Sequence, residues 1–198
     1  MRLLVVNAGS SSLKLQVLGP EDETVAARHV EGWDGEDSTP IDDLLAAAGP
    51  VDAVGHRVVH GGRDLVTACR VDDGVVEQIA SLTPLAPLHQ GRSVAGIRAA
   101  MTALPDVPHV ACFDTAYHAT LPEAAATYAL PAVWRLRWPL RRYGFHGLSH
   151  AYAARRAVEL VRAETGVAPG AADGPGGAAA GVPRVLTCHL GAGASLCA

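Results

Sequence analysis

The residues that most constrain the fold lie at the start of the chain, where two hydrophobic runs flank a turn of small residues. The first run, Leu3 to Val6, is continuous, which is typical of a strand buried on both faces. The second run, Leu13 to Leu18, alternates apolar and polar side chains, which is typical of a strand with one buried face. The turn is rich in glycine and serine, so we expect a β-hairpin here.

The turn of this hairpin has the chemistry of a phosphate-binding loop. Gly9 lets the backbone approach a ligand closely, and the three serines at positions 10 to 12 supply hydroxyl and amide donors. Lys14, the only lysine among the 16 Lys and Arg residues, adds a point charge. An ordinary serine-rich turn has the same composition. The segment by itself therefore leaves both interpretations open.

The rest of the chain alternates between strand-like and helix-like patterns. Further strands are expected at residues 24–30, 51–59, 109–113 and 184–190. Helices are expected from Thr39, at 75–82, around 94–104 and again after residue 142. Thr39 and Pro40 are expected to begin the first helix, as its cap and first-turn proline. This alternation predicts an α/β domain with a mixed sheet.

Composition excludes several classes of protein. A formal net charge of -4 argues against binding nucleic acid, although the Arg-rich, Trp-bearing segment at 134–142 offers that alternative. We interpret this segment as a solvent-exposed or active-site rim. The four cysteines form no CxxC pair and are expected to be reduced. No apolar run is long enough to cross a membrane, so a cytoplasmic protein that contacts no membrane is expected.

The pattern at the start of the chain recurs near its end. Both VVNAGSSSL and TCHLGAGASL place a buried strand before a glycine-rich turn and an apolar restart, which indicates a duplicated fold. The stretch between the two halves, residues 166–183, consists mainly of Gly, Ala and Pro and reads as a linker. We therefore expect a domain at 1–165, a linker at 166–183 and the first hairpin of a second domain at 184–198.

Six sequence blocks carry a resemblance to a known family. In chain order they are NAGSSSLK at 7–14, GHRVVHGG at 55–62, LAPLH at 85–89, FDTAYH at 113–118, YGFHGLSH at 143–150 and HLGAGAS at 189–195. Together they resemble the N-terminal half of the acetate kinase family, within the actin-like superfamily of sugar kinases and heat-shock ATPases. The resemblance implies an actin-like, ribonuclease H-like fold. It also implies reversible phosphoryl transfer between ATP and acetate, giving acetyl phosphate and ADP with Mg²⁺, and a homodimer for the complete family protein.

The same resemblance implies a set of site residues. The implied catalytic residues are Arg57, Asp114 and His146. The implied substrate-binding residues are Arg57, Val59, Leu88 and Phe145. The implied nucleotide- or phosphate-binding residues are Ser10, Ser12, Lys14, His189, Gly191 and Gly193, and the implied metal-binding residue is Asn7. Each of these residues also has a purely structural interpretation. Arg57 could form a surface ion pair, Asp114 could cap a turn, and Val59, Leu88 and Phe145 could be core residues. His146 and His150 have the spacing of a metal pair but lack an acidic HExxH partner, so we interpret His150 as structural.

Two departures from the family pattern limit what the resemblance implies. Ala192 stands where the family usually has asparagine, and family members are much longer than this chain. The chain is accordingly expected to be a fragment, a truncated product or one part of an assembly, and its activity by itself is left open. A kinase for propionate or another short carboxylate is one alternative. The other alternative is a catalytically incomplete domain that binds anions or a partner.

Overall fold

The computed structural model describes residues 1–9, 11–35, 37–138, 140–165, 184–191 and 193–198. It divides into two compact units, Met1–Phe145 and His146–Ala198, each of which is described by itself. The strands are β1 Leu3–Ala8, β2 Ser12–Leu18, β3 Thr24–Glu31, β4 Ala53–Val58, β5 Cys69–Arg70, β6 His109–Phe113, β7 Thr187–Leu190 and β8 Ala194–Cys197. The α-helices are α1 Thr39–Ala48, α2 Asp73–Ser81, α3 Gln90–Ala103, α4 Glu123–Ala126, α5 Ala132–Arg137 and α6 Gly147–Thr165. Short 3₁₀ helices occupy Thr83–Leu85 and Ala116–His118.

The first unit is built on a mixed six-stranded sheet in the order β3-β2-β1-β4-β6-β5. The inner strands β1, β4 and β6 run parallel, whereas β2, β3 and β5 pair antiparallel with their neighbours. Because parallel strands end at the same edge of a sheet, the residues that end or follow β1, β4 and β6 gather there. This edge is the natural place for a ligand site in an α/β sheet.

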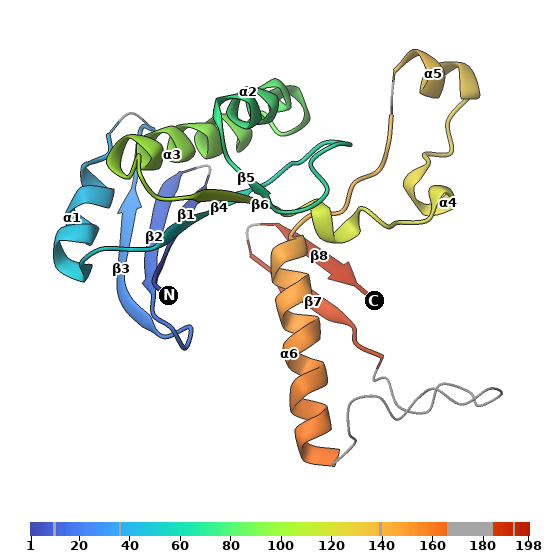
Figure 1. The fold of residues 1–198 in the computed structure, drawn as a ribbon. Coiled ribbons are helices and arrows are strands. Elements are labelled where there is room, and N and C mark those ends of the chain that lie inside the picture. The colour runs from blue at the N-terminus through green and yellow to red at the C-terminus, as the bar shows by residue number, and fades with distance from the viewer. Residues whose placement is uncertain (10, 36, 139, 166–183, 192) are drawn as a thin grey trace. The chain divides into compact units, whose positions relative to one another are not determined.

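Three helices cover one face of this sheet, with α3 lying across the strands and α1 and α2 to either side of it (Figure 1). One core cluster joins β1, β2 and β4 to α1 and α3 through residues such as Leu4, Leu15 and Ile41. A second cluster joins β4 and β6 to α2 and α3 through residues such as Phe113 and Ile97. Full burial of each large side chain stabilises the fold by about 1.5 to 3 kcal/mol, so this layer fixes the sheet edge firmly.

The second unit contains α6 and the β7–β8 hairpin, which packs against that helix. The two strands are antiparallel, with Thr187 opposite Cys197 and His189 opposite Ser195. The hairpin expected at 184–198 is thus present. The expected domain boundary at residue 165 falls at the end of α6, whereas the division by compactness falls before that helix. The assignment of 1–165 as one domain stays a prediction, and the expected linker at 166–183 lies outside the described residues.

Two local expectations were wrong. The first strand is not buried on both faces: Leu4, Val6 and Ala8 are buried, while the alternating residues are only partly covered because the helices lie on one side. Helix α1 has Ser38 rather than Thr39 at its N-cap, and Pro40 occupies the first turn as expected. Gly49 ends the helix with φ +81, a left-handed conformation that glycine adopts without steric cost. Among the described helices, none combines the length and the apolar character needed to cross a membrane.

Candidate functional site

Three predicted site residues of the first unit come together where β1, β4 and β6 end. Arg57 Nη2 donates to Asp114 Oδ2 at 2.7 Å, and Arg57 Nε donates to the same oxygen at 3.2 Å. Arg57 Nη1 donates to Asn7 Oδ1 at 3.1 Å. The strand order that places β4 between β1 and β6 therefore puts the guanidinium between an amide and a carboxylate.

Burial makes this cluster rigid. Asp114 is 1 % exposed, and its amide donates to the carbonyl of Val58. The Arg57 side chain keeps 30 % of its surface exposed. The guanidinium is therefore held by the buried carboxylate and still accessible to a ligand from solvent. A fork held by two partners loses little freedom when it binds a carboxylate or phosphoryl group. The structural interpretation of Arg57 as part of a surface ion pair does not fit, because the carboxylate of Asp114 is buried.

The oxygens of Asn7 and Asp114 suit a hard divalent cation, which binds carboxylate and amide oxygens. Both side chains accept from Arg57, so the structure supplies a partial rather than a complete cage. Within the described residues, no group of three or more His, Cys, Asp or Glu side chains is placed to hold a metal ion. Mg²⁺ in kinases is typically held by one or two carboxylates together with substrate phosphates, and this partial set fits that pattern.

The serine loop follows β1 directly. The amide of Gly9 donates to the carbonyl of Ser12 at 2.8 Å, which closes the turn. Lys14 lies opposite Asn7 in the β1–β2 register and is exposed. The loop therefore presents its lysine on the same hairpin that carries Asn7. Ser10, the other predicted phosphate ligand of the turn, lies outside the described residues.

The expected apolar substrate pocket of Val59, Leu88 and Phe145 stays a prediction, because these residues differ in their surroundings. Phe145 lines a cavity of about 470 Å³ with His60, Leu82, Leu85 and others, but neither Val59 nor Leu88 belongs to its lining. Val59 is half-buried, and Leu88 is 74 % exposed in the turn before α3. The alternative interpretation of Leu88 and Phe145 as core residues was wrong, because both are exposed.

His60 is a residue of the first unit to which the sequence assigned no role. It is buried, its Nδ1 accepts from the amide of Gly62 at 2.9 Å, and its ring meets the Tyr143 ring edge-on at 4.4 Å. Burial lowers the pKa of His60, in keeping with a neutral ring that accepts a hydrogen bond. Gln90 donates to the His60 carbonyl at 2.8 Å and so ties this loop to α3. The block GHRVVHGG marked the segment as special, but only the loop conformation shows this contact.

In the second unit, His146 belongs to a chain of hydrogen bonds. His146 Nδ1 lies 2.9 Å from Ser195 Oγ, and the same oxygen lies 2.8 Å from His150 Nε2. His150 Nδ1 lies 2.7 Å from Thr187 Oγ1, whose hydroxyl donates to the carbonyl of Cys197. The interpretation of His150 as structural agrees with its burial, but its contacts tie it to His146 through Ser195.

The direction of these hydrogen bonds assigns the tautomers. Because Thr187 donates to a carbonyl, its oxygen accepts from His150 Nδ1, which leaves His150 Nε2 to accept from Ser195. The Ser195 oxygen then accepts from Nδ1 of His146. A second proton on His146 would accordingly be carried at Nε2. His146 also has φ +57, a strained conformation that in non-glycine residues is often found at functional sites.

His189 and the glycine turn complete this cluster. The His189 ring stacks on the His146 ring at 4.0 Å between centroids, and His189 Nδ1 lies 2.9 Å from Ser149 Oγ. The amide of Gly191 donates to the carbonyl of Gly193, and a methyl group at Gly193 would stand 3.5 Å from the His146 ring. The predicted residues His146, His189 and Gly193 are therefore neighbours. Sequence reasoning missed the roles of Ser195 and Thr187, although Ser195 lies in the block HLGAGAS.

The comparisons with known proteins match the chain to acetate kinases. The model of the acetokinase family matches residues 41–198. A protein from Halothermothrix orenii named acetate kinase is 38 % identical, and the match covers 100 % of this chain and 54 % of that protein. The solved acetate kinase of Porphyromonas gingivalis is similar with a TM-score of 0.77 at 29 % identity, over 98 % of this chain and 54 % of that one.

A solved propionate kinase from Francisella tularensis is also similar, with a TM-score of 0.71 at 29 % identity over 81 % of this chain and 49 % of that one. The chain thus spans about half the length of the relatives it matches. The expected fold class, an actin-like α/β domain with a mixed sheet, is confirmed.

Proposed function

Because the chain belongs to the acetokinase family, we propose that it contributes to reversible phosphoryl transfer between ATP and acetate, giving acetyl phosphate and ADP. The observation that carries this proposal is the cluster of Arg57, Asp114 and Asn7 at the shared edge of three adjacent strands. A fixed, partly exposed guanidinium is the group that an anionic acceptor and a transferring phosphoryl group both require.

In the proposed reaction, an acetate oxygen forms a bond to the γ-phosphorus while the bond from that phosphorus to the β,γ-bridging oxygen breaks. Two anions must approach each other in line, so their charge has to be met by fixed donors. Arg57 supplies its fork to the acetate carboxylate and the phosphoryl oxygens. Asp114 is a buried partner that keeps the fork pointed at them.

His146 is proposed to donate to the transferring phosphoryl group. Its Nδ1 already donates to Ser195, so donation to a phosphoryl oxygen takes place from Nε2 and uses the doubly protonated ring. Stacking on His189 fixes the plane of the ring. A donor whose direction is set before the reaction stabilises charge that develops in the transition state without a cost of reorientation.

The nucleotide phosphates are proposed to meet Ser12 and Lys14 of the first hairpin and Gly191, Gly193 and His189 of the second. Asn7 and Asp114 would hold Mg²⁺, which when bound neutralises phosphate charge. Ser10 is proposed as a further ligand from the serine loop. Ala192, in place of the family asparagine, removes one amide side chain from this set.

Specificity for the acyl group is proposed to depend on Val59, Leu88 and Phe145. The similarity to the Francisella propionate kinase makes propionate the second candidate substrate. One methylene changes discrimination by only about 1 to 3 kcal/mol, so acetate and propionate are close competitors in an apolar pocket. A cytoplasmic location and a homodimer for the complete protein remain predictions.

The proposal can be tested in a fusion of residues 1–198 to the C-terminal half of the Halothermothrix relative. Acyl phosphate formation is measured with ATP, Mg²⁺ and either acetate or propionate. Arg57→Ala and His146→Ala should each lower kcat/KM about a hundredfold to a thousandfold, the usual loss for one positioned donor. Arg57→Lys should fail as well, because an ammonium cannot replace the fork.

The matched control is Arg98→Ala, which removes one arginine from an exposed pair with Glu77. It should keep kcat/KM within about twofold, since such surface pairs contribute little. If the fusion protein is active and all three site variants keep near-normal rates, Arg57 and His146 have no part in the mechanism.

A further inference from the structure

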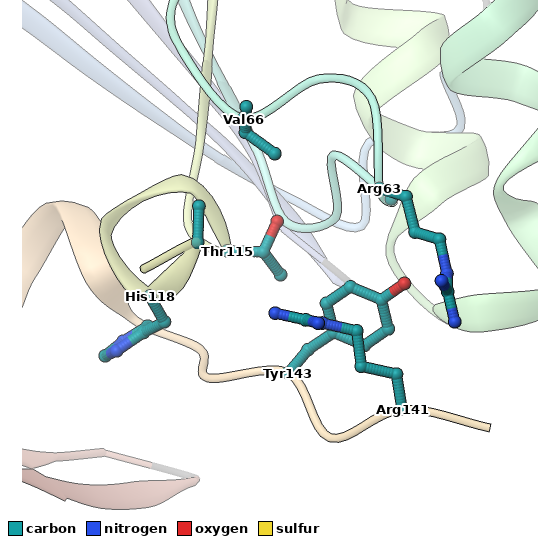
Figure 2. Close-up of a pocket in the computed structure, with 8 residues that line it drawn as sticks. Arg63, Val66, Thr115, His118, Arg141 and Tyr143 are labelled. Carbon is teal, nitrogen blue, oxygen red and sulfur yellow. The ribbon is translucent and has the colours of Figure 1, made fainter. Parts of the chain in front are cut away.

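A second basic cavity lies in the first unit, beside the loop that follows β4. It measures about 280 Å³ and is lined by Gly62, Arg63, Val66, Thr115, His118, Ala119, Arg141 and Tyr143. None of the residues assigned to phosphoryl transfer lines it. Figure 2 shows Arg63 entering from the loop above the cavity and Arg141 from the segment below, with Tyr143 between them. Two stretches far apart in sequence thus place guanidinium groups around one space.

Among the described residues, these two arginines have no acidic partner. In the described part of the chain, the ion pairs involve other residues, and neither Arg63 nor Arg141 has a carboxylate within ion-pair distance. The lining of this cavity contains no acidic residue. Asp64 lines only the adjoining 470 Å³ cavity. A bound anion would supply the countercharge that the lining lacks.

The remaining lining supplies neutral donors and rigidity. Thr115 is buried, and its oxygen accepts from the amide of Gly61 at 2.9 Å. Its own hydroxyl proton has no acceptor among the described residues, so it can be donated into the cavity. Arg141 lies over the Tyr143 ring, 5.9 Å from its centroid, and Tyr143 is braced by the buried His60. The position of Arg141 is therefore supported by packing.

We propose that this cavity binds a phosphate-class oxyanion through Arg63, Arg141 and Thr115, at a site separate from the Arg57 cluster. Two planar forks and a hydroxyl are three donor groups, whereas a carboxylate has two oxygens and a phosphate or phosphate monoester has at least three terminal oxygens. The anion is either free inorganic phosphate or the phosphoryl end of a small ester. The adjoining cavity shares Gly62, Arg63, Arg141 and Tyr143 with this one and adds Leu82, Leu85 and Phe145, which could receive an apolar substituent.

The test is titration of the 198-residue chain with inorganic phosphate and, in a second arm, with phenyl phosphate. Amide chemical shifts of Gly62 and Thr115 report binding at the cavity, and calorimetry gives the affinity. Arg63→Gln and Arg141→Gln should each weaken phosphate binding about tenfold or more. They should also abolish the changes that phosphate causes in the amide shifts of Gly62 and Thr115. Arg63 is exposed, so its replacement leaves the fold intact. A tighter fit for phenyl phosphate identifies the ester as the ligand, and an equal or weaker fit identifies free phosphate.

Two controls separate this site from other causes of anion binding. Arg137→Gln removes an arginine that stacks on Trp138 outside the cavity, and it should leave the affinity within about twofold. In Arg57→Gln, phosphate should still change the amide shifts of Gly62 and Thr115, because the proposed site does not include Arg57. Equal weakening by Arg137→Gln, loss of the shifts in Arg57→Gln, or no binding of either phosphate at millimolar concentrations would overturn the proposal.

Discussion

His56 Nε2 lies 2.9 Å from His109 Nδ1, and both rings are buried on the helix-covered face of the sheet. The rings are nearly parallel, with centroids 5.2 Å apart. His109 Nε2 lies 2.9 Å from the carbonyl of Leu104, so it carries a proton and Nδ1 of His109 accepts from His56. His56 Nδ1 is buried without a partner among the described residues. The buried pair therefore joins the strand that bears Arg57, through His56, to the neighbouring strand β6, through His109.

This pair predicts that the fold loses stability in mild acid. Burial, and then the neighbouring His109, lower the pKa of His56 from 6.5 to about 3. The unfolded chain takes up the proton near pH 6.5 and the folded chain only near pH 3. The contribution to stability is therefore fully present above pH 6.5 and falls as the pH drops towards 3. One proton gives a slope of at most about 1.4 kcal/mol per pH unit.

The measurement is the free energy of unfolding in urea at a series of pH values between about 4 and 7. His56→Gln should make the free energy of unfolding depend less steeply on pH, by up to the slope that the uptake of one proton gives. His29→Gln is the matched control, because His29 is exposed beside Glu31 and should leave the slope nearly unchanged. Curves of equal slope for His56→Gln and the unaltered chain would contradict the assignment of a buried neutral His56.

The Arg57–Asp114 pair predicts a large effect on stability from one carboxylate. Asp114→Ala removes the carboxylate that accepts from both Nε and Nη2 of Arg57. Removal of one member of a fully buried pair costs about 3 to 5 kcal/mol. Because Arg57 can reach water, we expect about 2 to 3 kcal/mol. Asp43→Ala, which breaks an exposed pair with Arg28, should cost less than about 1 kcal/mol. Similar unfolding midpoints for the two variants would count against a structural role for Asp114.

Ser195 predicts an effect on His146 that a merely structural residue would lack. Ser195→Ala removes the oxygen that contacts both His146 and His150, so Nδ1 of His146 loses its acceptor and this hydrogen bond no longer sets the direction of Nε2. Nitrogen chemical shifts of the imidazole would report this change directly. In the fusion protein we expect kcat to fall about tenfold or more with little change in KM. Ser195→Thr should restore both readouts, and Ser81→Ala, at an exposed helix end, should change neither.

Sequence patterns predicted the elements that have a local signal. The strand at 109–113 has the expected bounds, and the antiparallel hairpins near both ends of the chain are present because alternation and turn composition encode them locally. Asn7, Arg57 and Asp114 were named from the family resemblance, and they lie near one another because β1, β4 and β6 end at one edge of the sheet. Their meeting depends on the strand order, which a local pattern does not contain.

Patterns were less informative where partners come from distant segments. Leu160 and Val161 of α6 are both exposed although they are apolar, because a helical pattern says which residues align and not what covers them. The link from Ser195 to His146 and the meeting of Arg63 with Arg141 depend on turn and loop conformations. Short strand β5 and helices α4 and α5 were missed because few residues carry their signal.

Two glycines of the block GHRVVHGG predict opposite responses to the same substitution. A methyl group at Gly61 would overlap the carbonyl oxygen of Leu65 and stand 3.1 Å from Cγ of Phe113, so the loop backbone would have to move. A methyl group at Gly55, in β4, would meet nothing within 4 Å. We expect Gly61→Ala to destabilise the chain by about 1 to 3 kcal/mol, as overpacking usually does, and Gly55→Ala to be neutral or slightly stabilising. The comparison is made by urea unfolding, and equal midpoints for the two variants would contradict the close packing of the loop against β6.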